Sequence, residues 1–285
     1  MSAKTEGRPY QSYSSLSLFM RCPRLYRHRY VDGYRETDSQ VELEYGTAWH
    51  GAMACLNSGG TVSQAFTAAQ ETGVTLGKQW WAQISAALPV YAETYSHQLK
   101  TYKPILVEKE QTVVFEGVTF KAVFDAIVED SDGILALLEH KTTSSKDLTP
   151  EGMYWQRRAI DHQTTFYLWA ARQLGYDVQY IIYDVTRRCL HRQTKNENYA
   201  DFNTRVSSYI HANAGEVFVR REFEPSVPDT ELALSDLMAY ARMIGAGAFP
   251  RSPNNCTDYG RSCTFLPVCT GEVPLTQLQG VRKTK

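Results

Sequence analysis

The chain has 285 residues, 43 % of them hydrophobic, so it can bury a substantial core as one elaborated domain. Its six cysteines are too few and too unevenly spaced for a secreted disulfide scaffold, and no apolar run is long enough to span a membrane. We find no signal peptide at the amino terminus and expect a cytoplasmic protein with no membrane partner. The net charge of −1 gives no general attraction to nucleic acid, so any DNA contact must come from local basic patches.

The amino-terminal region is expected to form short, arginine-rich helices within residues 13–45. Residues 1–12 have the composition of a disordered end, and Ser14 or Ser15 can cap a helix that runs to Arg21. Pro23 then suits the first position of a second helix. The basic patches considered for DNA contact are equally compatible with solvated faces. They comprise Arg21, Arg24, Arg27 and Arg29; Arg157 and Arg158; and Arg187, Arg188, Arg192 and Lys195.

A helical insert is expected next, over residues 52–104. The segment Gly46-Thr-Ala-Trp-His50 enters a helix, on which a single histidine is more often a packed or surface residue than a ligand. Residues 61–103 have helical apolar spacing, and Pro89 is expected to kink or split the last helix.

Three β-strands are predicted at 105–115, 118–129 and 134–140, as part of a catalytic core over 105–185. The strands are rich in Val, Phe, Ile and Thr, and each break between them contains the glycine that a tight reversal needs. A three-residue loop ending at Gly133 pairs 130 with 134, which places Asp125 opposite Glu139 with Cβ atoms about 5 Å apart. Lys141 lies two residues beyond Glu139 and therefore on the same face of the sheet.

This grouping has a chemical use. Paired carboxylates bind a hard divalent cation such as Mg²⁺ or Mn²⁺, and a neighbouring lysine can serve the attacking water or neutralise charge in the transition state. The alternative is a cross-strand salt bridge on a solvated face. The continuous apolar run Ile134–Leu138 favours a buried strand, and with it a site.

The rest of the core alternates helix and strand. A helix is predicted from about Gly152 to Leu174, and Gln163 falls on its apolar stripe. A buried amide needs a polar partner, which is either a backbone group or a group of the site. A buried strand at 176–185 implies a crossover to the same sheet, followed by helices at 198–213 and 229–247 joined by a strand at 216–224.

Three cysteines lie close together near the carboxyl terminus. Cys256, Cys263 and Cys269 fall within fourteen residues, a density that favours a metal site over three unrelated buried thiols. Four thiolates are what an iron–sulfur cluster or a zinc site requires, so a fourth ligand is needed from elsewhere. Cys55 and Cys189 are interpreted as structural.

Asp125, followed fourteen residues later by Glu139-His140-Lys141, resembles the PD-(D/E)xK nuclease superfamily, with Phe124 in place of the proline. The other motifs are similar to its RecB-type branch, which includes CRISPR-associated spacer-processing exonucleases and iron–sulfur nucleases of helicase–nuclease complexes. The resemblance implies that His50, in a GxxxH motif, is a metal ligand. It also implies that Gln163 and Tyr167, in a QxxxY motif, reach the catalytic strands or the DNA strand.

The cysteines fit the same resemblance. The pattern SxSxLxxFxxCPxxYxxxY, ending at Tyr30, is similar to the amino-terminal signature of the iron–sulfur nucleases and implies that Cys22 is the fourth ligand of a 4Fe–4S cluster. The spacing from Cys256 to Cys263 is wider than the CxxC of the family. Such a cluster, within 250–270 and at Cys22, would tie the two ends of the chain together.

We therefore predict an α/β fold with a restriction-endonuclease-like mixed sheet flanked by helices, a helical insert and an iron–sulfur clasp, as a single nuclease domain over 1–285. The predicted function is metal-dependent hydrolysis of DNA, as an exonuclease acting on ends or single strands in recombination, repair or processing. A helicase or a recombination or CRISPR protein is the expected partner. The predicted metal ligands are His50, Asp125, Glu139 and the His140 carbonyl, and Lys141 serves the water. The alternatives are a catalytically silent scaffold that binds DNA ends and a zinc-stabilised binding module.

Overall fold

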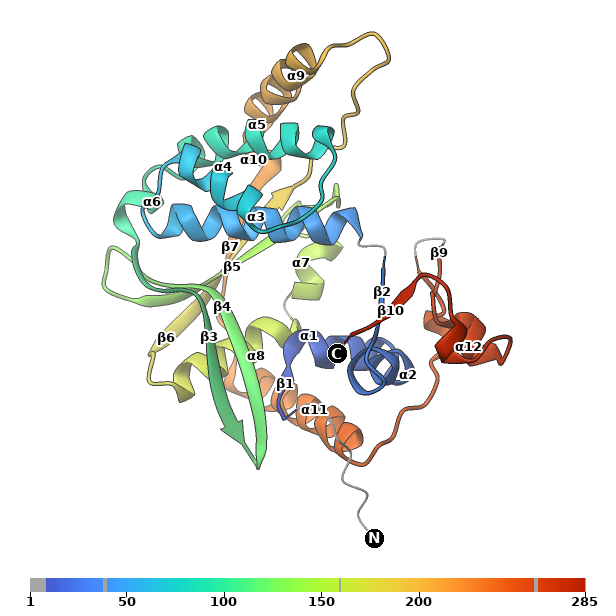
Figure 1. Ribbon diagram of the computed structural model, residues 1–285. Helices are drawn as coiled ribbons and strands as arrows, with labels where there is room; N and C mark the ends of the chain where they lie inside the picture. Colours follow the sequence, from blue (N-terminus) through green and yellow to red (C-terminus); the bar gives the residue numbers. More distant parts are fainter. Residues whose placement is uncertain (1–8, 38–39, 159, 259–260, 285) are drawn as a thin grey trace. The chain divides into compact units, whose positions relative to one another are not determined.

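The computed structural model describes residues 9–37, 40–158, 160–258 and 261–284, and the chain divides into two compact units (Figure 1). The first unit consists of Met1–Ser39, Gln111–Ala122 and Thr230–Lys285. The second unit consists of Gln40–Glu110 and Val123–Asp229. The single nuclease domain over residues 1–285 stays a prediction.

A mixed β-sheet is the centre of the fold. Its order is β4 (Val118–Glu129), β5 (Leu135–Thr143), β6 (Val178–Arg187) and β7 (Phe218–Phe223). The β5–β6 pair is parallel and its two neighbouring pairs are antiparallel, so the predicted mixed sheet with a crossover is confirmed. The short β1 (Gln11–Ser12) and the long β3 (Lys103–Phe115) also pair with β4.

The two tight reversals around β4 follow from the sequence. Glu116 and Gly117 have φ angles of 46° and 78°, the positive pair that a two-residue hairpin turn requires. Gly133 closes the second loop at φ 78°, in the left-handed conformation predicted for it. The ladder from Ala126↔Leu138 to Glu129↔Leu135 has the predicted register, although β5 continues three residues beyond the expected end at 140.

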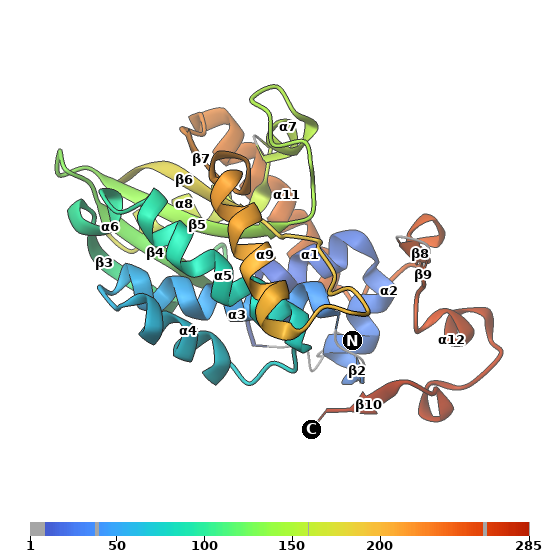
Figure 2. The same ribbon diagram turned by 90° about the horizontal axis from the view of Figure 1, so that it is seen from above.

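Helices of the second unit pack on one another beside the sheet. They are α3 (Val41–Asn57), α4 (Val62–Glu71), α5 (Lys78–Thr94), α6 (Gln98–Thr101), α9 (Tyr199–Ala212) and α10 (Ala214–Val217), and α5 lies along α9 in Figure 2. Trp49, Tyr91 and Phe202 belong to their shared apolar core. The expected split at Pro89 is wrong, because α5 continues through it. A Cβ on Gly51 would lie 2.6 Å from the Thr72 side chain, so only glycine allows α4 this close to α3.

The helices α7 (Met153–Arg158) and α8 (His162–Gln173) stand where one helix was predicted over 152–174. The prediction missed the break because Asp161 caps a new helix, its side chain accepting a hydrogen bond of 2.9 Å from the Gln163 N–H. Ile160 is 76 % exposed and does not continue the apolar stripe. Tyr183 contacts Thr164 of α8, and Asp184 contacts Tyr91 of α5. Successive strand residues point to opposite faces, so α8 and α5 cover opposite faces of the sheet.

The first unit brings the two ends of the chain together. The Ser12 side chain caps α1 (Tyr13–Arg21), in place of the expected Ser14 or Ser15, and α2 (Pro23–Tyr26) begins at proline as predicted. A π-helical turn (Arg27–Val31) leads to β2 (Tyr34–Glu36), which pairs with β10 (Val281–Lys283). Gln11 and Ser12 are ordered, contrary to the expected disorder, and residues 1–8 lie outside the described chain. The carboxyl-terminal elements are α11 (Val227–Gly245), the 3₁₀ turns Pro253–Asn255 and Leu275–Gln277, β8 (Thr257–Asp258), β9 (Arg261–Ser262) and α12 (Leu266–Thr270).

Within the described ranges, no helix has both the length and the apolar character needed to cross a membrane.

Candidate active site

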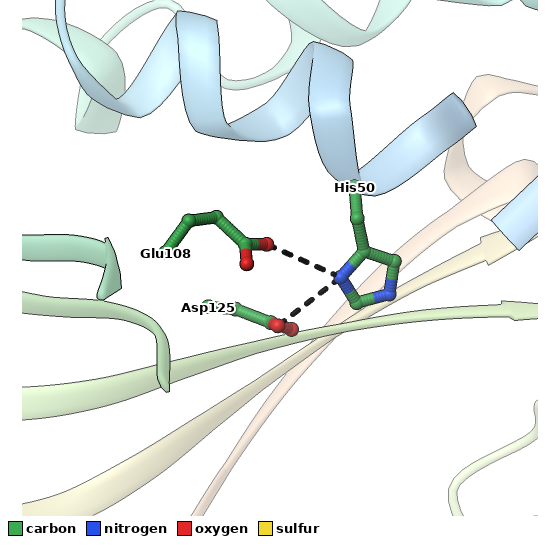
Figure 3. Close-up of side chains that lie close together, drawn as sticks. All are labelled: His50, Glu108 and Asp125. Carbon is green, nitrogen blue, oxygen red and sulfur yellow. Dashed lines mark hydrogen bonds and ion pairs between the residues drawn. The ribbon is translucent and has the colours of Figure 1, made fainter. Parts of the chain in front are cut away.

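His50, Glu108 and Asp125 converge in the second unit (Figure 3). The Nδ1 atom of His50 lies 3.1 Å from Asp125 Oδ1 and 3.6 Å from Glu108 Oε1. One ligand atom from each residue falls within 4.8 Å of the other two, a group that can hold a metal ion. The sequence predicted His50 and Asp125 for this site, but it did not point to Glu108.

Glu108 reaches the group through an unusual backbone conformation. Its φ angle is 44°, inside a β-strand and in a region that residues other than glycine rarely adopt. Such a conformation costs free energy and is found mainly where the surrounding structure enforces it, often at functional sites. Glu108 and Glu110 are both polar residues on the same face of the predicted strand. The alternation of polar and apolar residues therefore does not distinguish Glu108 as a site residue.

Glu139, Lys141 and Gln163 form a second, adjoining set. The Lys141 ammonium donates to Glu139 Oε1 at 2.5 Å and to Gln163 Oε1 at 2.7 Å. The half-buried Gln163 amide of the QxxxY segment therefore reaches the predicted catalytic strand rather than a backbone group. The Glu139 side chain is buried, and its Oε2 atom has no hydrogen-bond partner among the described residues.

His140 contributes differently through its backbone and its side chain. Its backbone N–H donates to Asp125 Oδ2 at 2.7 Å and so holds the aspartate on the neighbouring strand. Its buried imidazole points to the opposite face, where Nδ1 lies 3.0 Å from Asp184 Oδ2 and Nε2 lies 2.9 Å from the Asn57 amide nitrogen. The predicted role of the His140 carbonyl as a metal ligand stays a prediction.

The charges at this site strongly perturb one another. Burial alone would lower the pKa of His50, but the Asp125 and Glu108 carboxylates raise it to about 10. Burial and the charge of Asp125 raise the pKa of Glu139 to about 7, against the opposing effect of Lys141. The pKa of Lys141 is raised because the attraction of Glu139 and Asp125 exceeds the cost of burial. The raised pKa values of His50 and Lys141 show that the neighbouring carboxylates favour positive charge at this site.

The residues fit a divalent cation. Two carboxylates and one imidazole supply the oxygen and nitrogen donors that Mg²⁺ or Mn²⁺ accepts. The adjoining Glu139 carboxylate has one buried oxygen without a partner in the described part of the chain. His50, Glu108 and Lys141 also line an open groove with Gly46 and Thr142, which gives a substrate access.

Tyr167 and the predicted DNA-binding arginines occupy varied positions. Tyr167 is buried against Phe124, with ring centroids 5.6 Å apart. Arg21 and Arg157 are exposed. The Arg24 side chain donates a hydrogen bond to the Phe249 carbonyl, and Arg158 forms an ion pair with Asp161. Their DNA contacts stay predictions.

The four predicted cluster cysteines all lie in the first unit. The Asn255 amide donates to the Arg21 carbonyl at 2.5 Å, and the Arg24 N–H donates to the Pro250 carbonyl at 3.1 Å, so Cys22 lies beside the segment before Cys256. The Cys263 N–H donates to the Cys256 carbonyl at 2.7 Å. Burial, and then the charges of Cys269, Cys22 and Cys256, raise the pKa of Cys263.

Comparisons with known families and structures found matches to this chain. A family model described as PD-(D/E)XK nuclease superfamily matches residues 10–270. The fold is similar to the crystal structure of a protein from Eubacterium rectale named "putative exonuclease", with a TM-score of 0.54 and 14 % identity over 93 % of this chain and 94 % of that chain. A second structure, SSO0001, gives a TM-score of 0.32 at 11 % identity over 81 % and 82 % of the two chains, too low to carry an argument. No curated protein matches the sequence.

Proposed function

The chain belongs to the PD-(D/E)XK nuclease superfamily, and from that premise we propose that it is a metal-dependent deoxyribonuclease. It would hydrolyse phosphodiester bonds as an exonuclease on DNA ends or single strands. The observation that carries the proposal is the convergence of four elements of the second unit beside an open groove that His50 and Lys141 line. His50 comes from α3, Asp125 from β4, Glu139 and Lys141 from β5, and Gln163 from α8.

We propose that His50, Asp125, Glu139 and the His140 carbonyl hold Mg²⁺ or Mn²⁺, with Glu108 as an additional carboxylate. When bound, such a cation supplies Lewis-acid stabilisation of charge on the phosphate. The unpartnered Oε2 of Glu139 and the crowding of carboxylates around His50 both favour a cation here.

Lys141 acts as an ammonium rather than as a free base, because its two carboxylate neighbours raise its pKa. It is held by Glu139 on its own strand and by Gln163 from α8, which fixes the direction in which its remaining N–H can point. In that state it can orient the attacking water and stabilise the charge that develops on the phosphate. Gln163 therefore positions Lys141, and Tyr167 of the same helix packs against Phe124.

The test is incubation of purified protein with end-labelled single-stranded and double-stranded DNA in Mg²⁺, Mn²⁺ or EDTA. We expect progressive shortening from an end, abolished by EDTA and by Lys141→Ala, while Lys141→Ala still binds DNA. Wild-type cleavage by Lys141→Ala would refute the assignment of Lys141. Binding to DNA ends without cleavage in either metal would instead support the silent scaffold.

We further propose that Cys22, Cys256, Cys263 and Cys269 hold a 4Fe–4S cluster that joins distant segments of the first unit. The supporting observations are the adjacency of Cys22 to residues 249–255 and the mutual influence of the four thiols. Protein purified without air should be brown and contain about four irons per chain. One zinc and no iron would refute the cluster, but not the nuclease, whose proposed residues lie in the second unit. The DNA-processing pathway, the partner protein and the cytoplasmic location stay predictions.

A further inference from the structure

A basic cavity lies at the ends of the two parallel strands β5 and β6. The backbone N–H of Arg188 donates to the Thr143 carbonyl at 2.7 Å, so the segments that follow β5 and β6 leave the sheet side by side at this edge. The cavity has a volume of about 420 Å³, and its lining includes Ser144, Lys146, Arg187 and Arg188. Lys141 is three residues before Ser144, a distance of about 10 Å along a strand. The edge formed by the carboxyl ends of parallel strands is a common place for ligands in α/β proteins.

The cations of this cavity are not equally available. Arg187 pairs with Glu216, with an N–O distance of 2.9 Å, and is largely neutralised. Lys146 is exposed. Arg188 has Glu42 as its nearest carboxylate, but at 3.9 Å, which is too far for a hydrogen bond. The cavity thus keeps positive charge from Lys146 and Arg188.

Arg188 is the informative residue. Only 8 % of it is exposed, and its Nε and Nη1 atoms have no hydrogen-bond partner within the described part of the chain. The central carbon of the guanidinium lies 6.0 Å from the ring centroids of both Tyr45 and Trp80, so the side chain packs beside the two rings. Burying donors without acceptors is unfavourable, and a phosphate is the group that a planar guanidinium matches best.

We propose that this cavity is a phosphate-binding subsite, in which Arg188 and Lys146 hold a backbone phosphate of the nucleic-acid strand whose cleaved bond lies at the candidate active site. The inference rests on the proposed nuclease function. It adds a position at which the strand is gripped beyond the site of cleavage, through its backbone and therefore without regard to base sequence.

The experiment measures binding of a fluorescein-labelled twenty-nucleotide thymidine strand by anisotropy, in a Lys141→Ala background that does not cleave it. Each variant is titrated at several salt concentrations. Lys146→Ala should weaken binding about tenfold, as expected for one lost charge-assisted contact. It should also lower the salt dependence of log K by about 0.7, the value for one phosphate contact to a single strand. Arg188→Gln should do the same. Lys100→Ala, an exposed lysine outside both the cavity lining and the predicted basic patches, is the matched control and should change neither quantity.

Thermal unfolding of each variant separates binding from folding, because Arg188 also packs beside two rings. Lys146 is exposed, so Lys146→Ala should retain the wild-type melting temperature and keeps the test decisive if Arg188→Gln is unstable. An unchanged salt dependence in Lys146→Ala, or an equal change in Lys100→Ala, overturns the subsite while DNA cleavage by the wild-type protein still upholds the nuclease. Absence of both cleavage and strand binding in the wild-type protein overturns the two together.

Discussion

Replacing Gln163 by leucine tests whether the contact between α8 and the catalytic lysine serves the reaction. Gln163 Oε1 accepts a hydrogen bond of 2.7 Å from the Lys141 ammonium. A hydrogen bond to a charged group is worth about 1.5–3 kcal/mol. If that free energy is lost only from the oriented, reactive state, kcat/KM should fall by about 10- to 150-fold, since each 1.4 kcal/mol is a factor of ten. Leucine suits a helix and is apolar like the neighbouring buried residues of α8, so the fold should be retained.

The assay compares kcat/KM on an end-labelled single strand with the melting temperature of each variant. Gln173→Leu is the matched control, because it makes the same chemical change at an exposed position of the same helix. We expect Gln173→Leu to leave both quantities unchanged. A Gln163→Leu protein with activity within twofold of wild type would show that the contact with Lys141 does not serve the reaction. A loss of melting temperature with no specific loss of activity would make the contact purely structural.

Three further predictions follow from the geometry. Glu108→Gln should raise the half-saturating Mn²⁺ concentration about tenfold in cleavage assays, because it removes one carboxylate beside His50. The control Glu110→Gln should leave that concentration unchanged, and equal effects of the two substitutions would show that Glu108 is not part of the site. Asp184→Asn should lower the free energy of unfolding in urea by about 3–5 kcal/mol, because it leaves the buried Arg220 guanidinium without its counter-ion, and a loss under 1 kcal/mol would contradict this. Cys256→Ser should lose iron and colour while Cys55→Ser keeps them; full iron in Cys256→Ser would mean that another residue is the fourth ligand.

The hairpin that forms the site was predictable because its information is local. The glycine at the second reversal fixes the turn and with it the register of the ladder, which runs from Glu129↔Leu135 to Ala126↔Leu138. Asp125 and Glu139 follow directly after this ladder. The neighbouring contact of Lys141 with Glu139 then follows from the period of two along a strand. Turn chemistry and strand period were sufficient for these residues, and no long-range information was needed.

Other features depend on contacts that a linear pattern does not contain. Glu108 enters the site because its backbone adopts a positive φ, which nothing in the surrounding letters requires. The break between α7 and α8 depends on whether Asp161 caps a new helix or lies inside a longer one. The partner of the His140 imidazole is Asp184, on a strand reached only after the α8 crossover. Each of these is decided by tertiary packing rather than by local propensity.

The Glu-His-Lys triplet gains a physical meaning from the two helical layers around it. Because strand side chains alternate, Glu139 and Lys141 face α8 and meet Gln163, whereas His140 faces the layer of α3 and α5 and meets Asn57. Asn57 lies seven residues after His50 on α3, which is about two helical turns, so both point from one side of that helix. The contact of Asn57 with His140 therefore fixes where α3 lies along β5, and with it the place of His50 against Asp125. The end of β5 thus positions the Lys141 ammonium and the Glu139 carboxylate on one face of the sheet. On the other face it positions α3, the helix that carries His50.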